Sequence, residues 1–158
     1  MNRNVCFFAV VAILALPDST MPAAGPAPQG KTLAQKAVEK VAARHPEIAS
    51  LELAAARSES EGCKTIAATE TKEIGEKCDQ DEFTAMKTNQ PFVEKEKDGF
   101  DVTMPLHDAA GTVIGTVGMD FKPEPGQEKA AVVRQAKQIA AEIEKLISSK
   151  EKLFEPAE

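Results

Sequence analysis

The segment from Gly99 to Lys122 consists of two strand-like stretches around a short turn rich in Asp and Gly. In the first stretch, alternate residues are apolar and the residues between them are polar or proline. The two sets are Phe100, Val102, Met104 and Leu106, against Asp101, Thr103 and Pro105. A period of two is typical of a strand with one buried face. The segment therefore predicts two antiparallel strands, at 100–106 and 113–121, joined by the turn at 107–111.

Further strand patterns precede this pair. Three short strands are predicted at 48–56, 63–69 and 92–96. The first has apolar side chains at alternate positions, although its alanines leave a helix open. The turn at 97–99 joins the third strand to the next one as a hairpin. The stretch between the second and third strands, residues 71–86, is acidic and is expected to be helical or looped.

Two amphipathic helices flank the strands. Thr32 and Gln35 have the spacing of a capping box before an apolar stripe, and Pro46 ends that helix. Residues 127–149 carry a second apolar stripe, which must be buried either on the sheet or against another copy. The tail at 153–158 is expected to be loose. Short antiparallel strands with helices at both ends predict an α+β fold.

The N-terminus has the pattern of an export signal. Arg3 precedes an apolar run of 12 residues from Val5 to Leu16, which is shorter than the ~20 residues that span a bilayer. We therefore expect a cleaved signal peptide at 1–24, a flexible linker at 25–31, and a periplasmic or secreted protein. An uncleaved membrane anchor is the alternative.

Cys63 and Cys78 are the two cysteines that remain after cleavage. An even number of cysteines in an exported chain predicts a disulfide, with a reduced pair as the alternative. The pair would close a loop of about 15 residues and stabilise the fold by roughly 3 kcal/mol. Its spacing matches neither a redox motif nor a zinc site.

The composition excludes several classes of ligand. The formal net charge is -6, whereas a nucleic-acid binder needs a basic surface. The chain has no Trp and no Tyr, so its only aromatic side chains are Phe. Stacking platforms for bases are therefore not expected. The composition is that of a small, acidic, globular domain.

The hairpin at 99–122 resembles the closing strands of Cache domains, which are extracytoplasmic PAS-like sensor modules. The resemblance rests on Pro105-Leu106, on the turn from Asp108 to Gly111, and on the Val-Ile-Gly-Thr-Val-Gly-Met-Asp run at 113–120. It implies a PAS-like antiparallel sheet between an N-terminal helix and a long C-terminal helix. The sensor domain would then cover 32–122, followed by a helix and tail at 123–158.

The resemblance also bears on ligands and partners. The amino-acid-binding members of the family use Tyr, Trp and Arg positions, so an amino-acid ligand does not carry over to a chain without Tyr and Trp. Family members continue toward the membrane after the sheet. The helix at 127–149 is accordingly expected to pair in a homodimer or to dock onto a membrane-protein partner.

The polar face of the predicted sheet supplies the candidate binding residues. Asp101, Thr103 and Asp120 face solvent unless a second layer covers them, in which case they would fix a small polar ligand. Thr69, Lys87 and Phe92 are the candidates for the remaining walls of such a pocket.

No catalytic, metal or cofactor site is predicted. The acidic residues Asp79, Asp81 and Glu82 lack the glycine and the spacing of a calcium loop. His107 lies in a turn and is expected to be solvated. No nucleophile has a visible base, so we do not expect an enzyme.

The sequence thus favours an exported Cache-like domain that binds a small polar molecule, and signals or docks without catalysis. The alternative is a structural or adaptor protein that has no ligand pocket and assembles through its C-terminal helix.

Overall fold

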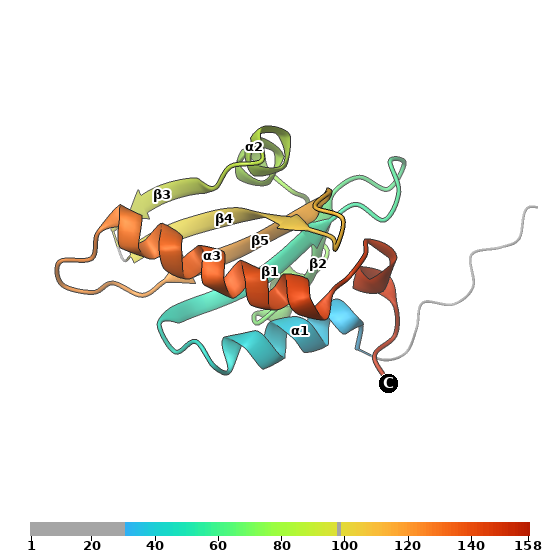
Figure 1. Cartoon of the computed structure of the whole chain (residues 1–158), viewed down its shortest axis with the longest axis horizontal. Helices are drawn as coiled ribbons and strands as arrows, with labels where there is room; N and C mark the ends of the chain where they lie inside the picture. Colours follow the sequence, from blue (N-terminus) through green and yellow to red (C-terminus); the bar gives the residue numbers. More distant parts are fainter. Residues whose placement is uncertain (1–30, 98) are drawn as a thin grey trace, which may run out of the picture.

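A computed structural model of the chain describes residues 31–97 and 99–158 (Figure 1). The predicted signal peptide at 1–24 and positions 25–30 of the predicted linker lie outside the described residues. Within the described ranges, no helix is both long and apolar enough to cross a membrane.

A five-stranded antiparallel sheet is the centre of the fold, which confirms the predicted α+β class. Its strands are β1 (Ile48–Ala55), β2 (Lys64–Ala68), β3 (Phe92–Glu96), β4 (Gly99–His107) and β5 (Val113–Phe121). They lie in the order β2-β1-β5-β4-β3. The last strand in the chain therefore occupies the middle, between β1 and β4. All five predicted strands are present, and the alanine-rich stretch at 48–56 is a strand and not a helix.

Two helices cover one face of the sheet. Helix α1 (Leu33–Ala42) packs on β1 and β2, and α3 (Lys129–Leu146) packs on β4 and β5 (Figure 1). The stripe of α3 is buried there, with Ile139 and Ile143 fully inaccessible to solvent. These side chains belong to the same core as Val117 and Met119 of β5. The apolar stripe predicted for this helix thus packs against the sheet of its own chain.

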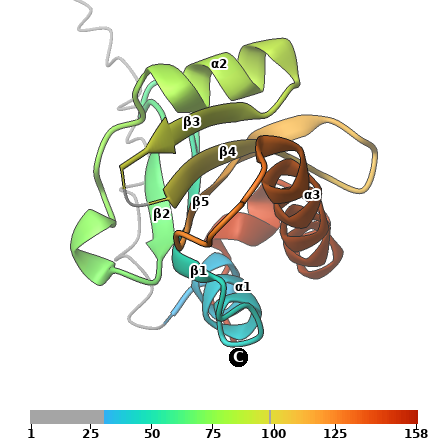
Figure 2. The same cartoon turned by 90° about the vertical axis from the view of Figure 1, so that its left-hand side faces the viewer.

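A thinner layer covers part of the opposite face. Helix α2 (Gln80–Thr88) packs there on β3, β4 and β5, while α1 and α3 lie on the other side of the sheet (Figure 2). The acidic stretch before it forms a short 3-10 helix, η1 (Thr71–Glu73), and a loop. Ala85 is the one buried residue that α2 contributes. Because α2 is short, it leaves part of this face uncovered.

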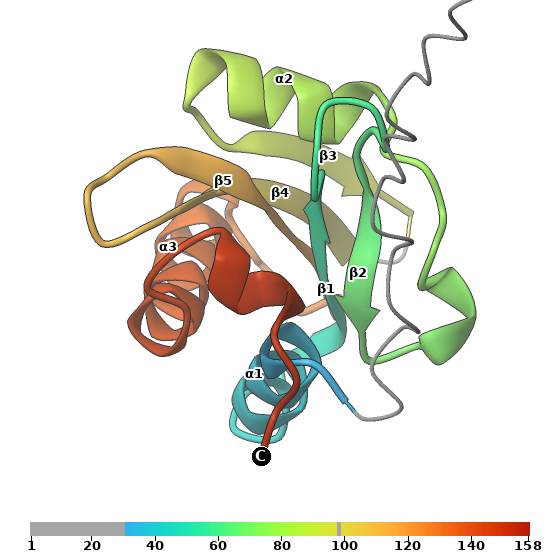
Figure 3. The same cartoon turned by 90° about the vertical axis from the view of Figure 1, so that its right-hand side faces the viewer.

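The C-terminal tail is ordered against α1, contrary to the expectation of a loose end. It forms a 3-10 helix, η2 (Glu151–Phe154), and the chain then ends beside α1 (Figure 3). Leu153 of this helix is fully buried. Backbone hydrogen bonds then join Leu33 to Glu155 and Ala157 to Lys31. Leu153 and Phe154 are adjacent apolar residues in this tail, but they form no helical or strand repeat, so the burial of Leu153 was not visible in the sequence.

The predicted capping box of α1 is only half formed. The Thr32 hydroxyl accepts a hydrogen bond from the Gln35 backbone N–H, as expected. The Gln35 side chain, however, turns away to the sheet, where it donates to the Ala68 carbonyl at 2.9 Å and accepts from the Ala68 N–H at 3.1 Å. The amide therefore satisfies both backbone groups of a buried residue in β2.

Replacing Gln35 by Leu is expected to lower the free energy of unfolding by about 1–3 kcal/mol, because it leaves both Ala68 backbone groups buried without partners. Urea denaturation would measure the loss. The matched control is Gln80→Leu, since the Gln80 amide bonds only to the exposed Thr84 hydroxyl. An equal loss of unfolding free energy in the two variants would show that the hydrogen bonds from Gln35 to Ala68 do not stabilise the fold.

Candidate functional site

The uncovered part of the α2 face is hollowed into a cavity of about 210 Å³. Two rows of residues from β1, β5 and β4 form its floor. Strand register places Asp120 beside both Ser50 and Asp101, and it places Gly118 beside both Glu52 and Thr103. Because side chains alternate along a strand, both rows project to the same face. A side chain at Gly118 would collide with Glu52, since a Cβ there would lie 2.8 Å from the Glu52 Cγ.

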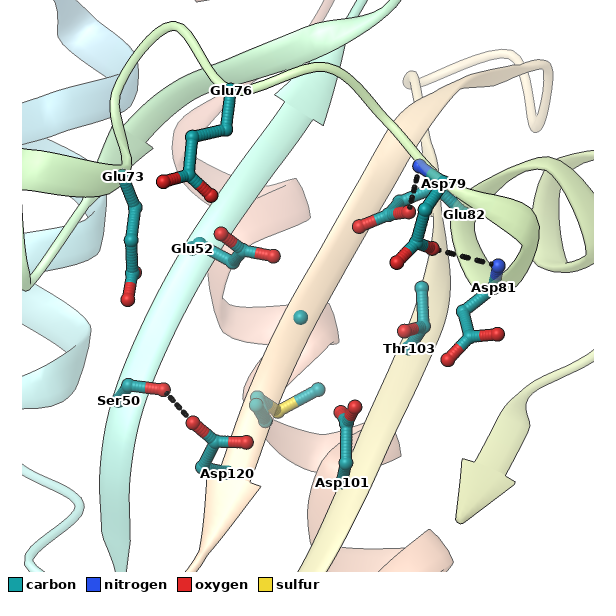
Figure 4. A pocket seen from close by; sticks show the side chains of 12 residues that line it. Ser50, Glu52, Glu73, Glu76, Asp79, Asp81, Glu82, Asp101, Thr103 and Asp120 are labelled. Atoms are coloured by element: carbon teal, nitrogen blue, oxygen red, sulfur yellow. Dashed lines mark hydrogen bonds between the residues drawn. The ribbon is translucent and has the colours of Figure 1, made fainter.

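The wall of the cavity comes from η1, the loop after it, and the first turn of α2 (Figure 4). The Asp79 side chain caps α2, and the Glu82 side chain accepts a hydrogen bond from the Asp79 N–H in return. The disulfide between Cys63 and Cys78 links this wall to the start of β2. The predicted pairing of the two cysteines is therefore present, and it holds the wall next to the sheet.

Floor and wall together carry eight carboxylates, which define the acidic cavity: Glu52, Glu73, Glu76, Asp79, Asp81, Glu82, Asp101 and Asp120. The other lining residues are Ser50, Thr103, Gly118 and Met119. Within the part of the chain that the structure describes, no Lys, Arg or His lines the cavity. Like charges at this density repel one another, and water screens them less inside a cavity than on an open surface.

The carboxylates in the floor respond to this environment. Burial, followed by the Glu82 and Glu73 charges, raises the pKa of Glu52 to about 7. Burial, followed by the Asp120 and Asp81 charges, raises the pKa of Asp101 to about 7. Both groups are therefore close to half ionised at neutral pH.

The carboxylates in the wall shift in both directions. Burial is the main cause that raises the pKa of Glu73, Asp81 and Glu82. The Glu82 side chain and the Asp81 backbone N–H instead lower the pKa of Asp79. The cavity therefore becomes more negative as pH rises, and its carboxylates do not all ionise together.

Thr103 points its hydroxyl into the cavity without a partner. Its side chain is 4% exposed, and the described residues offer the hydroxyl no hydrogen bond (Figure 4). Its neighbour Asp101 has neither a hydrogen bond nor an ion pair within the described ranges. By contrast, the Ser50 hydroxyl donates to Asp120, and the Thr65 hydroxyl donates to Glu52 at 3.3 Å. Among the described residues, the buried side-chain atoms without a hydrogen bond are Thr116 Oγ1 and one Glu142 oxygen. The Thr103 hydroxyl is open to the cavity, so it marks a place where a ligand atom would fit.

The structure brings three of the six predicted binding residues to this cavity, namely Asp101, Thr103 and Asp120. The other three lie elsewhere. Thr69 is exposed and its hydroxyl accepts a hydrogen bond from the Leu51 N–H. Lys87 is exposed in the last turn of α2, and Phe92 is a half-buried residue of β3 paired with Thr103.

Sequence reasoning missed five carboxylates of the wall and one of the floor. The alternation at 48–56 already placed Ser50 and Glu52 on one polar face, so this signal was available for Glu52. The wall residues belong to the acidic stretch at 71–86, which the sequence left as a helix or loop. Among the described residues, no group of three or more His, Cys, Asp or Glu is arranged to hold a metal ion.

A second hollow of about 250 Å³ lies between the end of β4, the residues after α2, and α3. His107 lies there, and it is less solvated than the sequence suggested. Its ring nitrogens are 2.8 Å from a Glu144 carboxylate oxygen and 2.7 Å from the Asn89 side-chain oxygen. His107 thereby connects β4 to α3 and to the end of α2. Its role is to hold these elements together.

Comparisons with known proteins bear on the fold. No protein-family model matches the sequence, and no curated protein matches it. Solved structures do match in shape. The GAF domain of an Acinetobacter phosphoenolpyruvate-protein phosphotransferase superposes with a TM-score of 0.53 at 10% identity, covering 75% of this chain and 83% of that one. A putative GAF sensor protein from Burkholderia vietnamiensis gives a TM-score of 0.53 at 11% identity, covering 77% and 80%.

The chain has a GAF-like fold. GAF domains belong to the PAS-like group of folds, so the predicted sheet architecture is confirmed at that level. The narrower resemblance to Cache domains stays a prediction. At these identities the likeness concerns the fold alone, and the properties of the cavity come from the residues of this chain.

The two floor carboxylates are expected to make the folded protein less stable as pH rises. Their pKa is about 7 in the folded state and about 4 in the unfolded chain. The folded state therefore holds more protons between about pH 4 and pH 7, and the free energy of unfolding falls as pH rises through this window.

Glu52→Gln and Asp101→Asn should each raise the free energy of unfolding at pH 8 by about 1 kcal/mol, after allowance for partial exposure, and should do much less at pH 5. Chemical denaturation at the two pH values measures this. Glu59→Gln, in an exposed turn, is the control. A gain that is the same at pH 5 and pH 8 would contradict the assignment.

Proposed function

We propose that this protein is an exported GAF-like binding domain that holds a small polar molecule in the acidic cavity. In this proposal the molecule is bound and not chemically converted. Binding is passed on to a partner by a change in how the domain docks. The single observation that carries the proposal is the Thr103 hydroxyl, which belongs to a residue that is 4% exposed and which faces the cavity with no hydrogen bond to a described residue.

The cavity has the position and the chemistry for such a role. It lies between the sheet and α2, and polar groups from three strands and from the wall line it. A ligand that bridges Asp101 in the floor and Glu82 in the wall would tie α2 to the sheet. Because the α2 layer is thin, its position is the property that a ligand can change most easily.

Export is part of the same proposal. The disulfide between Cys63 and Cys78 supports it, since structural disulfides persist mainly outside the reducing cytosol. The signal-peptide prediction concerns residues outside the described part, so the disulfide is the structural argument for an oxidising compartment.

Partners also remain a proposal. The apolar stripe of α3 packs inside the fold, with Ile139 fully buried. A homodimer or a membrane-protein partner would therefore use the outer, polar side of this helix. No observation favours the adaptor alternative, which depends on a stripe that is free for assembly.

A thermal-shift screen of the oxidised protein tests the binding role. The panel contains carboxylates, amino acids, purines, polyamines and divalent metals. One chemical class is expected to raise the midpoint, because a ligand at a hundredfold excess over its dissociation constant stabilises the native state by about 2.7 kcal/mol. The shift should shrink in Thr103→Val and persist in Thr112→Val, whose hydroxyl is in an exposed turn.

Two outcomes would contradict the proposal. One is the absence of a shift with every class, together with cooperative unfolding. The other is a shift that Thr103→Val leaves intact, which would place the ligand outside the acidic cavity. In either case, sedimentation would then test assembly through the C-terminal helix.

A further inference from the structure

Ion pairs among the described residues do not balance the charge of the acidic cavity. Seven ion pairs join described residues, and none of them uses any of the eight cavity carboxylates. Carboxylates elsewhere, such as Glu39 and Glu155, do have a lysine partner at 2.8 Å and 2.6 Å. The contrast is specific to the cavity. A bound cation would supply the counter-charge that ion pairs among the described residues do not.

The carboxylates also surround the cavity and do not converge on one point. Figure 4 shows Asp101 and Asp120 at one end of the floor, Glu52 beyond them, and Asp79, Asp81 and Glu82 on the wall. Among the described residues, no three acidic or other ligating side chains are arranged around a single metal position. A ligand with positive charges at two separate points matches this arrangement better than one compact ion does.

The size of the cavity limits the ligand. A volume of about 210 Å³ corresponds to about seven water molecules at the ~30 Å³ that each occupies in the liquid. Register places Gly118, which has no side chain, between Glu52 on β1 and Thr103 on β4. The Glu52 side chain lies over Gly118. A short methylene chain would therefore run beside Glu52, with polar groups at either end of it.

We propose that the ligand of the acidic cavity is a short aliphatic diamine. The proposal rests on the binding role proposed above and specifies the chemical class. One ammonium group donates hydrogen bonds to Asp101 and to the Thr103 hydroxyl. The other donates to Glu52 and to carboxylates of the wall. The methylene groups between them cross the cavity beside the Glu52 side chain, which covers Gly118. Thr103 thus gains the hydrogen bond that it lacks.

Protonation of the cavity competes with such a ligand. The raised pKa of Glu52 and of Asp101 means that each group gives up a proton when an ammonium group binds near neutral pH. Glu73, Asp81 and Glu82 of the wall face the same space, and their pKa is raised as well, so they lose protons in the same direction. Alkylammonium groups keep their own proton up to about pH 10, as lysine does. Binding should therefore strengthen as pH rises from 6 to 8.

Isothermal titration calorimetry with 1,4-diaminobutane tests the proposal directly. The comparison ligands are 1-aminobutane, butane-1,4-diol and Ca²⁺. The diamine is expected to bind at least tenfold more tightly than the monoamine, and the diol is expected not to bind. Glu52→Gln and Asp101→Asn should each weaken diamine binding about tenfold. Glu59→Gln, which removes an equal charge from an exposed turn, should leave it unchanged.

The variants are suited to this test because they remove repulsion and should fold at least as well as the parent. Thermal unfolding of each variant, without ligand, checks this before the titrations. Proton release on binding, measured in buffers of different ionisation enthalpy, gives a second readout. It should fall in Asp101→Asn, because that variant has one titrating carboxylate fewer.

The outcomes separate the ligand class from the binding role. If the diol, a carboxylate or Ca²⁺ binds in a manner that depends on Thr103 and the diamine does not, the diamine is wrong and the binding role stands. If Glu59→Gln weakens diamine binding as much as Asp101→Asn does, the diamine is attracted by the overall negative charge of the protein, and the proposed site is wrong. If no ligand of any class binds, the binding role fails as well.

Discussion

The pairing of β5 with both β1 and β4 is the constraint on which the rest of the structure depends. One face of these three strands supplies Val117, Met119 and Phe121 to the core beneath α1 and α3. Register on the other face aligns Asp120 with Ser50 and Asp101, and Gly118 with Glu52 and Thr103. A shift of one residue in this register would exchange the two faces. The buried core therefore fixes the register, and the register fixes the floor of the acidic cavity.

The apolar core and the acidic cavity lie on opposite faces of the sheet, which explains how the fold tolerates so many negative charges in one place. The repulsion among the cavity carboxylates opposes folding, and most of the apolar burial that offsets it lies on the opposite face. The disulfide at Cys63 and Cys78 adds a covalent link where the wall joins the sheet. The first turn of α2 is stabilised locally, because the Asp79 and Glu82 side chains accept hydrogen bonds from backbone N–H groups at its start.

Local patterns predicted the strands and helices well, because each pattern is read within a few residues. The stretch at 113–121 is a strand with the predicted bounds, and Asp101, Thr103 and Asp120 share the cavity as the alternation required. The cavity wall was not predictable in the same way. Whether the stretch at 71–86 lies against β1 or β4 depends on distant contacts and on the disulfide. The burial of Leu153 likewise depends on α1, far away in the sequence.

The two ends of the described fold meet beside α1, where Ala157 donates a backbone hydrogen bond to Lys31. This junction lies on the helical side of the sheet, and the acidic cavity opens on the side of α2 (Figure 2). A tether at either end would thus hold the domain by the same point. It would leave the cavity facing outward, so that the protein could be immobilised on a surface from either end with its cavity accessible.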